Sequence, residues 1–391
     1  MFVRINSTGK PLNQADFILT LMSVFWDSGR AELEDFCRRA RTPTTREASP
    51  YNHFIDPEPD QLLRVSVGLG FKRARLNYVY SILRGKDLET ETFSEESRIE
   101  QFGVLQHAQS RVLNLSHWHD FFNVIIQAGF RSDKMITSQN NLLFSYILYL
   151  IGRTELNTDP FQLKNAVARW FFMSSLSARY SASPESAMEA DLARLRHVED
   201  GEAFVSVLDR IEQGVLTDDY WNITLPNDLA TSSSRSPSLF AYYAALNLLD
   251  ARVLFSNSRV SELLDPATRP VRSPIERHHL FPRAYLENIG ISETRDVNQI
   301  ANFAMVEWGD NGRISDEPPH SYARRYESRF TAEQLERMRY WHALPRDWEH
   351  MEYQDFLEGR RKLMAQVIRD GYRVLCGYSE YAYAGSLARG S

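Results

Sequence analysis

The sequence predicts a mainly α-helical protein with a small α+β region near its C-terminus, followed by a long final helix. Apolar residues recur at helical spacing through most of the first 250 residues. From about residue 255 this pattern stops, because Pro266, Pro270, Pro274 and Pro282 interrupt any long helix. A final apolar stripe within 351–375 predicts the closing helix.

The first predicted helix covers 12–26, where Phe17, Ile18, Leu21 and Met22 share one face. The segment 41–60 follows with four prolines among threonine, serine and charged residues, which predicts an exposed loop. A run of further helices is expected at 61–84, 96–113, 117–129, 139–152, 160–179, 184–197, 200–213 and 237–248.

Two local signals fix boundaries within this run. Ser183-Pro184-Glu185 combines a capping residue type, a proline at the first helical position and an acid near the positive helix end. The polar segment 227–238 predicts a break before the last of these helices. Three domains are therefore expected: 1–60, 61–254 and 255–391.

Composition limits the class of protein. The 391 residues carry a net charge of −6, so the chain is not basic throughout, although it contains short basic clusters. These clusters, at 38–41, 72–75 and 360–362, are either phosphate contacts or solvated helix faces. Two distant cysteines argue against a disulfide framework. The longest apolar stretch, Leu142 to Ile151, is about half a membrane span, so we expect a cytoplasmic protein without a membrane partner.

Within the α+β region, short extended segments are expected at 274–281 and 299–308, followed by a basic helix at 320–329. The first segment contains His278-His279, with Pro282 three residues later. Hydrolysis of a phosphodiester needs a base to activate water, and neutral imidazole, with an ordinary pKa of about 6.5, suits that task. Adjacent histidines on a strand nevertheless point to opposite faces, so they serve one site only where the strand end bends.

The downstream segment supports a site at this pair. Asn302 lies in the second extended segment, and Asn311 lies in a Gly-Asp-Asn-Gly turn before the basic helix. A strand, a turn and a helix would let Asn311 fold back toward the first strand. This hairpin and helix would form a small scaffold able to hold one metal ion.

The motif "RHHLFPRAYL…NQIANFAMVEWGDNGRISDEPPHSYA" resembles the HNH, or ββα-metal, nuclease domain at the C-terminal end of GmrSD-type restriction proteins. The resemblance implies that His279 is the general base and His278 the adjacent metal ligand. It implies that Asn302 braces the histidine loop and that Asn311 is the second metal ligand. Glu317 departs from the pattern, because many relatives carry lysine there.

The resemblance also implies a cofactor and a substrate. A site of one histidine and one amide without cysteine favours Mg²⁺ or Mn²⁺ over a structural zinc centre. DNA, possibly modified, is the expected partner. The candidates for backbone phosphate contacts, which would make binding depend on salt, are Arg277, Arg283, Arg313, Arg324 and Arg325.

The first residues, "FVRINSTGKPLNQADF", resemble the closing part of the ParB-like N-terminal domain of the same family, with Arg4, Asn6 and Gly9 at matching positions. That domain binds nucleotide in the family, but its acidic-Gly-Gln-Gln-Arg motif is missing from this sequence. Nucleotide binding through Arg4 and Asn6 is therefore expected to be weak. The remainder of the domain is expected upstream in a longer protein or on a separate polypeptide.

The sequence therefore predicts an HNH endonuclease that cleaves phage or modified foreign DNA. Two alternatives remain open. Because the sensing domain is incomplete, the chain could be a non-catalytic DNA-binding or regulatory module. It could also be an RNA-directed nuclease, since the predicted site does not itself select the sugar.

Overall fold

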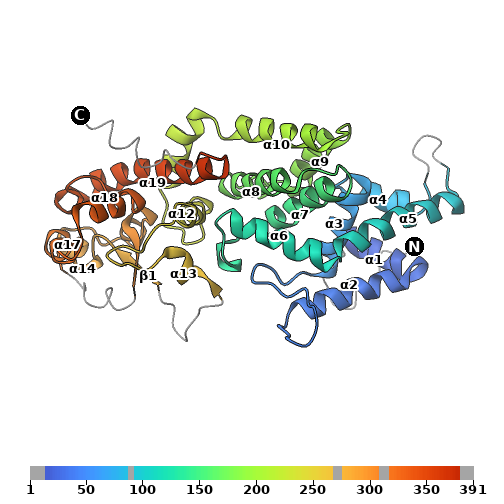
Figure 1. The fold of residues 1–391 in the computed structure, drawn as a ribbon, viewed down its shortest axis with the longest axis horizontal. Helices are drawn as coiled ribbons and strands as arrows, with labels where there is room; N and C mark the ends of the chain where they lie inside the picture. Colours follow the sequence, from blue (N-terminus) through green and yellow to red (C-terminus); the bar gives the residue numbers. More distant parts are fainter. Residues whose placement is uncertain (1–13, 87–91, 267–274, 308–316, 379–391) are drawn as a thin grey trace. The chain divides into compact units, whose positions relative to one another are not determined.

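A computed structural model describes residues 14–86, 92–266, 275–307 and 317–378 (Figure 1). The prediction of a mainly helical chain with a small sheet is confirmed, since these ranges form helices and one two-stranded antiparallel sheet. The elements are α1 (Gln14–Phe25), α2 (Asp27–Ala40), α3 (Pro59–Phe71), α4 (Leu76–Leu83), α5 (Glu95–Val112), α6 (Leu115–Gln127), η1 (Asp133–Met135), α7 (Gln139–Thr154), α8 (Pro160–Leu176), α9 (Pro184–Leu195), α10 (Gly201–Val215), the π-helical turn η2 (Tyr220–Thr224), α11 (Leu225–Asp228), α12 (Pro237–Leu248), α13 (Val260–Leu264), β1 (Ile275–His279), α14 (Arg283–Asn288), α15 (Thr294–Val297), η4 (Ile300–Asn302), β2 (Phe303–Glu307), α17 (Pro319–Glu327), α18 (Ala332–Trp341), η5 (Trp348–His350) and α19 (Tyr353–Leu375).

The chain divides into two compact units. Unit 1 contains the described residues up to Val124 together with Ser138–Val167 and Arg179–Arg210. Unit 2 contains Ile125–Thr137, Ala168–Ala178 and the described residues from Ile211 onward. The histidine pair and the sheet belong to unit 2.

Unit 1 is a helical bundle around an aromatic core. The indole of Trp118 packs edge-on against Phe36 and Tyr146, with ring centroids 5.4 and 5.2 Å apart, and its Nε1 donates a hydrogen bond to the carbonyl of Pro50. The hydroxyl of Tyr146 donates to the carbonyl of Val112 at 2.8 Å. The buried polar groups of Trp118 and Tyr146 thus have hydrogen-bond partners.

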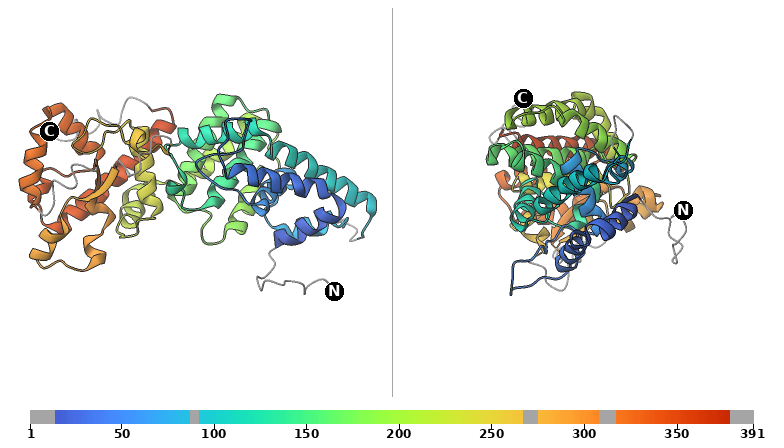
Figure 2. Two further views of the ribbon diagram at one scale, coloured as in Figure 1. Left: turned by 90° about the horizontal axis from the view of Figure 1, so that it is seen from below. Right: turned by 90° about the vertical axis from the view of Figure 1, so that its right-hand side faces the viewer.

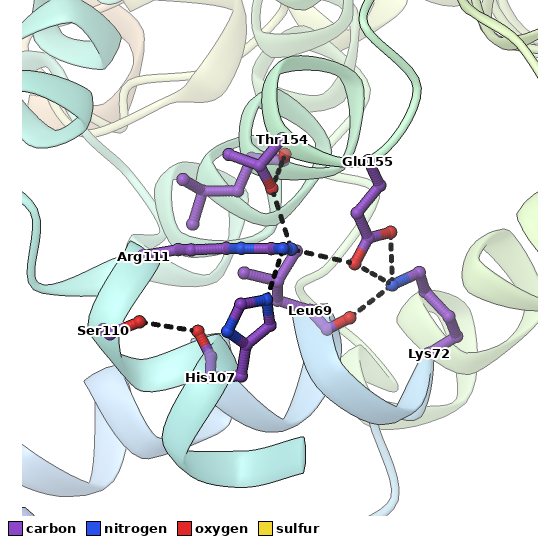
Figure 3. A network of polar contacts seen from close by, with 8 residues as sticks. Leu69, Lys72, His107, Ser110, Arg111, Thr154 and Glu155 are labelled. Atoms are coloured by element: carbon purple, nitrogen blue, oxygen red, sulfur yellow. Dashed lines mark hydrogen bonds and ion pairs between the residues drawn. The ribbon is translucent and has the colours of Figure 1, made fainter. Parts of the chain in front are cut away.

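The predicted helix at 61–84 is wrong in one respect, because the structure has two helices there, α3 and α4. Lys72 takes a left-handed backbone conformation, with φ of 52°, and ends α3. Its ammonium group contacts the carbonyl of Leu69 and the carboxylate of Glu155, which also lies 3.7 Å from the Arg111 guanidinium (Figure 3). These contacts hold the chain reversal in place.

The other cations of the 72–75 cluster are engaged within the protein. Arg73 forms an ion pair with Glu189 at 2.7 Å, and the same carboxylate accepts the backbone N–H groups of Ala74 and Arg75. The side chain of Arg75 donates to Ser186. The cluster therefore ties the turn between α3 and α4 to α9.

The long apolar stretch in 142–151 forms the buried middle of α7. Among the residues that the structure describes, no helix is long and apolar enough to cross a membrane.

Unit 2 is organised around α12 and α19, which pack closely together. A Cβ atom placed on Gly371 would lie 2.5 Å from the Cβ of Ala245, so this crossing requires a residue without a side chain. The red α19 also runs past the orange segment that carries η4 and β2 (Figure 2). Its Phe356 packs against Phe281, with ring centroids 4.7 Å apart.

Unit 2 also buries a histidine away from the sheet. The side chain of His342 is 1% exposed, and its Nε2 is 2.9 Å from the carbonyl oxygen of Arg252. Burial lowers the pKa of His342 to about 4, with the hydrogen bond to Arg252 opposing this change and the charge of Arg360 adding to it. The folded protein therefore keeps this imidazole neutral at pH values where the unfolded chain is protonated.

We predict a loss of stability in acid that originates at His342. The unfolded state binds a proton below pH 6.5 and the folded state does not, so stability falls from pH 6.5 until it levels off near pH 4. The full effect is about 3 kcal/mol, because each pKa unit corresponds to about 1.4 kcal/mol. Urea unfolding across this range should show a shallower pH dependence for His342→Gln than for the unchanged protein. An equal pH dependence of stability in the two proteins would show that the acid effect does not originate at His342.

Candidate histidine–asparagine site

The site is built on the β1–β2 pair. The strands are antiparallel, with His279 opposite Phe303, His278 opposite Ala304 and Ile275 opposite Glu307. The backbone N–H of Leu280 donates to the carbonyl of Asn302 at 2.8 Å, which continues the pairing beyond the strands. The connection 280–302 carries α14, α15 and η4 and returns the chain to the histidine pair.

His279 lies at the end of β1 and is half-buried. Its ring packs against Phe303, with centroids 4.4 Å apart, and its Nε2 is 2.9 Å from the side-chain oxygen of Asn298. An amide oxygen accepts hydrogen bonds, so this contact places the imidazole hydrogen on Nε2 and leaves the lone pair on Nδ1. The contact thereby fixes both the tautomer and the rotation of the ring.

The environment of His279 favours the neutral imidazole. Burial lowers the pKa of His279 from its ordinary value, the hydrogen bond to Asn298 partly opposes this, and the nearby charge of Arg283 lowers the pKa further. A neutral imidazole with a free lone pair is the form that can accept a proton.

His278 faces a different set of groups. It is 3% exposed, and its ring meets Tyr322 of α17 edge-on, with centroids 5.5 Å apart. The hydroxyl of Tyr322 donates to the carbonyl of Leu280 at 2.5 Å. The helix α17 is therefore attached to the strand at the histidine pair, and the two imidazoles have different surroundings, as alternation along a strand requires.

Asn302 is fully buried and holds the turn that follows the histidines. Its side-chain oxygen accepts the N–H of Phe281 at 2.9 Å. Its amide nitrogen donates to the carbonyls of Phe281 and Val297, both at 3.1 Å. One side chain thus joins the chain after β1 to the end of α15.

Several predicted residues lie outside the described ranges. These are Asn311, Arg313, Arg4 and Asn6. The backbone of Arg277 pairs with Met305 in the sheet.

The other predicted phosphate contacts are visible. Arg283 forms an ion pair with Glu287 at 2.8 Å, so a phosphate would compete with that carboxylate. Arg325 donates to both carboxylate oxygens of Glu317, at 2.9 and 3.1 Å. Arg324 is exposed on α17. Glu317 is therefore an acidic partner for a predicted DNA-contacting arginine.

Two features of the site were missed in the sequence. Asn298, which contacts His279, stands four residues before Asn302 in "NQIAN", and a second amide beside the brace was the available signal. Arg360 was considered as part of a basic surface, but the structure buries it completely. Because its neighbours Arg361 and Lys362 are half-buried and exposed, these three residues do not form a continuous basic surface.

The predicted metal ligands are partly visible. Within the described ranges, no group of three or more histidine, cysteine or acidic side chains could hold a metal ion. Of the two expected ligands, His278 lies on β1, and Asn311 belongs to the segment 308–316, outside the described ranges. The imidazole of His278 is a ligand type that suits a divalent metal ion.

Comparison with known proteins gives no independent assignment: no family model matches the chain, and neither a curated protein nor a solved structure matches it significantly.

Proposed function

We propose that this protein is a metal-dependent HNH endonuclease that cleaves foreign DNA, with β1, β2 and α17 as its ββα-metal unit. The observation that carries the proposal is the contact between Nε2 of His279 and the side-chain oxygen of Asn298. It orients a half-buried, neutral imidazole so that Nδ1 is free to act as a base.

His279 removes a proton from the attacking water at Nδ1, and Asn298 keeps the imidazole in the required tautomer. Burial supports this role because it keeps the imidazole neutral at ordinary pH. Asn302 fixes the backbone after His279 and so limits movement of the base during the reaction.

A divalent metal ion, Mg²⁺ or Mn²⁺, would be held by His278 and Asn311 and would supply charge stabilisation at the phosphate. Cations on and near α14 and α17 bind the backbone phosphates, among them Arg324, which is exposed on α17. Arg283 and Arg325 reach phosphate by exchanging their carboxylate partners.

The wider proposal is a role in defence against phage or modified DNA in the cytoplasm. It keeps the three-part organisation, with a ParB-like remnant before residue 60, a helical middle and the nuclease region from 255. This assignment rests on the resemblance of the two motifs.

Nicking of a supercoiled plasmid tests the proposal. With Mg²⁺ or Mn²⁺ the purified chain should convert the plasmid to open-circular and linear forms, and EDTA should stop the conversion. A parallel RNA substrate decides between DNA and RNA as the target. Salt-dependent DNA binding without cutting, in both metals and on modified phage DNA, would overturn the enzyme assignment and indicate a regulatory module.

A further inference from the structure

Helix α19 contacts the segment that carries both asparagines of the site. Arg360 is fully buried, and its Nη1 donates to the carbonyl of Ala301 at 2.6 Å. Its Nε donates to the carbonyl of His342 at 3.1 Å, so the guanidinium joins the end of α18 to η4. Ala301 is the residue immediately before Asn302.

A second cation of α19 binds the same segment three residues earlier than Asn302. Arg361 donates to the side-chain oxygen of Gln299 at 3.0 Å, and the amide nitrogen of Gln299 donates to the carbonyl of Arg295 at 2.9 Å. Gln299 follows Asn298 directly, so this chain of contacts fixes the residue that orients His279.

The start of α19 supplies a third contact. The hydroxyl of Tyr353 donates to the carbonyl of Asp296 at 2.8 Å and lies 3.4 Å from the carbonyl of Val297. The carbonyl of Val297 also accepts from Asn302. Three α19 side chains therefore bind 296–301, the segment around Asn298 that leads into Asn302.

We propose that Arg360 and Arg361 are positioning residues of the candidate nuclease site, acting through 296–302 on Asn298 and Asn302. This inference rests on the proposed function for its effect on catalysis, although the positioning itself can be measured in the absence of substrate.

The chemistry of Arg360 supports a geometric role. Burial of a cation is costly, and an apolar side chain of similar size often stabilises a core equally well. A planar guanidinium, unlike the ammonium of lysine, can donate at once in two fixed directions. Arg360 uses this property on carbonyls from two separate elements, which sets the distance between them.

Amide hydrogen exchange provides the direct test. The N–H of Phe281 is bonded to the side chain of Asn302, so its exchange rate reports the brace. We expect Arg361→Met and Gln299→Leu to increase that rate about tenfold by local opening, while amides in α12 keep theirs. Lys362→Met is the matched control, because Lys362 is exposed and pairs with Glu358 on the same helix.

Cleavage kinetics give the second readout. Arg361→Met should lower kcat about tenfold, in the range found for groups that orient catalytic residues, with KM unchanged. Arg360→Lys should show a larger effect in both experiments, because lysine cannot bridge both carbonyls. If Arg360→Lys fails to fold, the Arg361 and Gln299 variants still test whether α19 positions Asn298 and Asn302.

The outcomes distinguish a failure of the positioning role from a failure of the proposed nuclease function. Unchanged exchange at Phe281 in Arg361→Met and Gln299→Leu overturns the positioning role, whatever the activity. A raised KM with unchanged exchange also overturns it, because Arg361 would then contact the substrate directly. Faster exchange at Phe281 in a protein that cuts no nucleic acid would leave the positioning intact and remove the proposed function.

Discussion

Replacing His279 with alanine is expected to lower kcat for DNA cleavage about 10²- to 10⁴-fold, the contribution usual for a general base. The imidazole is the group whose Nε2 is held by Asn298 and whose Nδ1 is free to accept a proton. Because His279 is half-buried at the end of a strand, its loss should cost about 1 kcal/mol of stability. Plasmid nicking, together with urea unfolding of the same preparation, measures both effects.

The pH profile of the unchanged protein provides a check on the same residue. The active form of a base is deprotonated, and burial lowers the pKa of His279. The rate should therefore stay level down to about pH 6.5, the ordinary pKa of histidine, and fall only in more acidic solution. His350→Ala is the matched control, because His350 is an exposed histidine of the same unit that stacks on His320. Undiminished cutting by His279→Ala would remove the base from the mechanism.

Local signals in the sequence predicted many helix positions correctly. Pro184 begins α9 and Pro237 begins α12, as proline at the first helical position predicts. The Ser183 side chain makes no capping hydrogen bond, so the position was right although one of its expected contacts is absent.

The errors arose where tertiary contacts determine the local structure. The helical spacing in 61–84 continues through Lys72, and the break there depends on Glu155 and Glu189 from distant parts of the chain. The helices α2 and α18 were not predicted, because their charged residues obscure their apolar faces.

In the candidate site, too, local sequence signals predicted some residues, and contacts between distant segments determine the others. The motif predicted His278, His279 and Asn302 as site residues, and the structure places Asn302 against the turn after the histidines. The contacts of Asn298 and Arg360 were missed, because they depend on the path of 280–302 and on the approach of α19. For Asn298 the sequence offered only its spacing from Asn302. A buried arginine and an exposed one look alike in a sequence, since only packing distinguishes them.

Replacing Asn302 with alanine is expected to destabilise the protein by about 3–5 kcal/mol, since buried groups left without partners cost about 1–3 kcal/mol each. The variant leaves the N–H and carbonyl of Phe281 and the carbonyl of Val297 without the Asn302 amide. Asn302→Asp tests the donors specifically, because aspartate has nearly the same shape but, when ionised, can only accept. Its carboxylate would face two carbonyl oxygens, so a comparable or larger loss is expected.

Asn298→Ala is the comparison that separates stability from chemistry. Asn298 is half-buried and contacts His279, so its removal should leave the urea midpoint close to that of the unchanged protein and still slow cleavage. Asn302→Ala should instead lower the midpoint and the rate together, because the same three hydrogen bonds stabilise the turn and set the backbone after His279. If Asn302→Ala has the same urea midpoint as the unchanged protein, the Asn302 side chain does not brace this turn. The position of His279 would then depend on the sheet pairing and on Asn298.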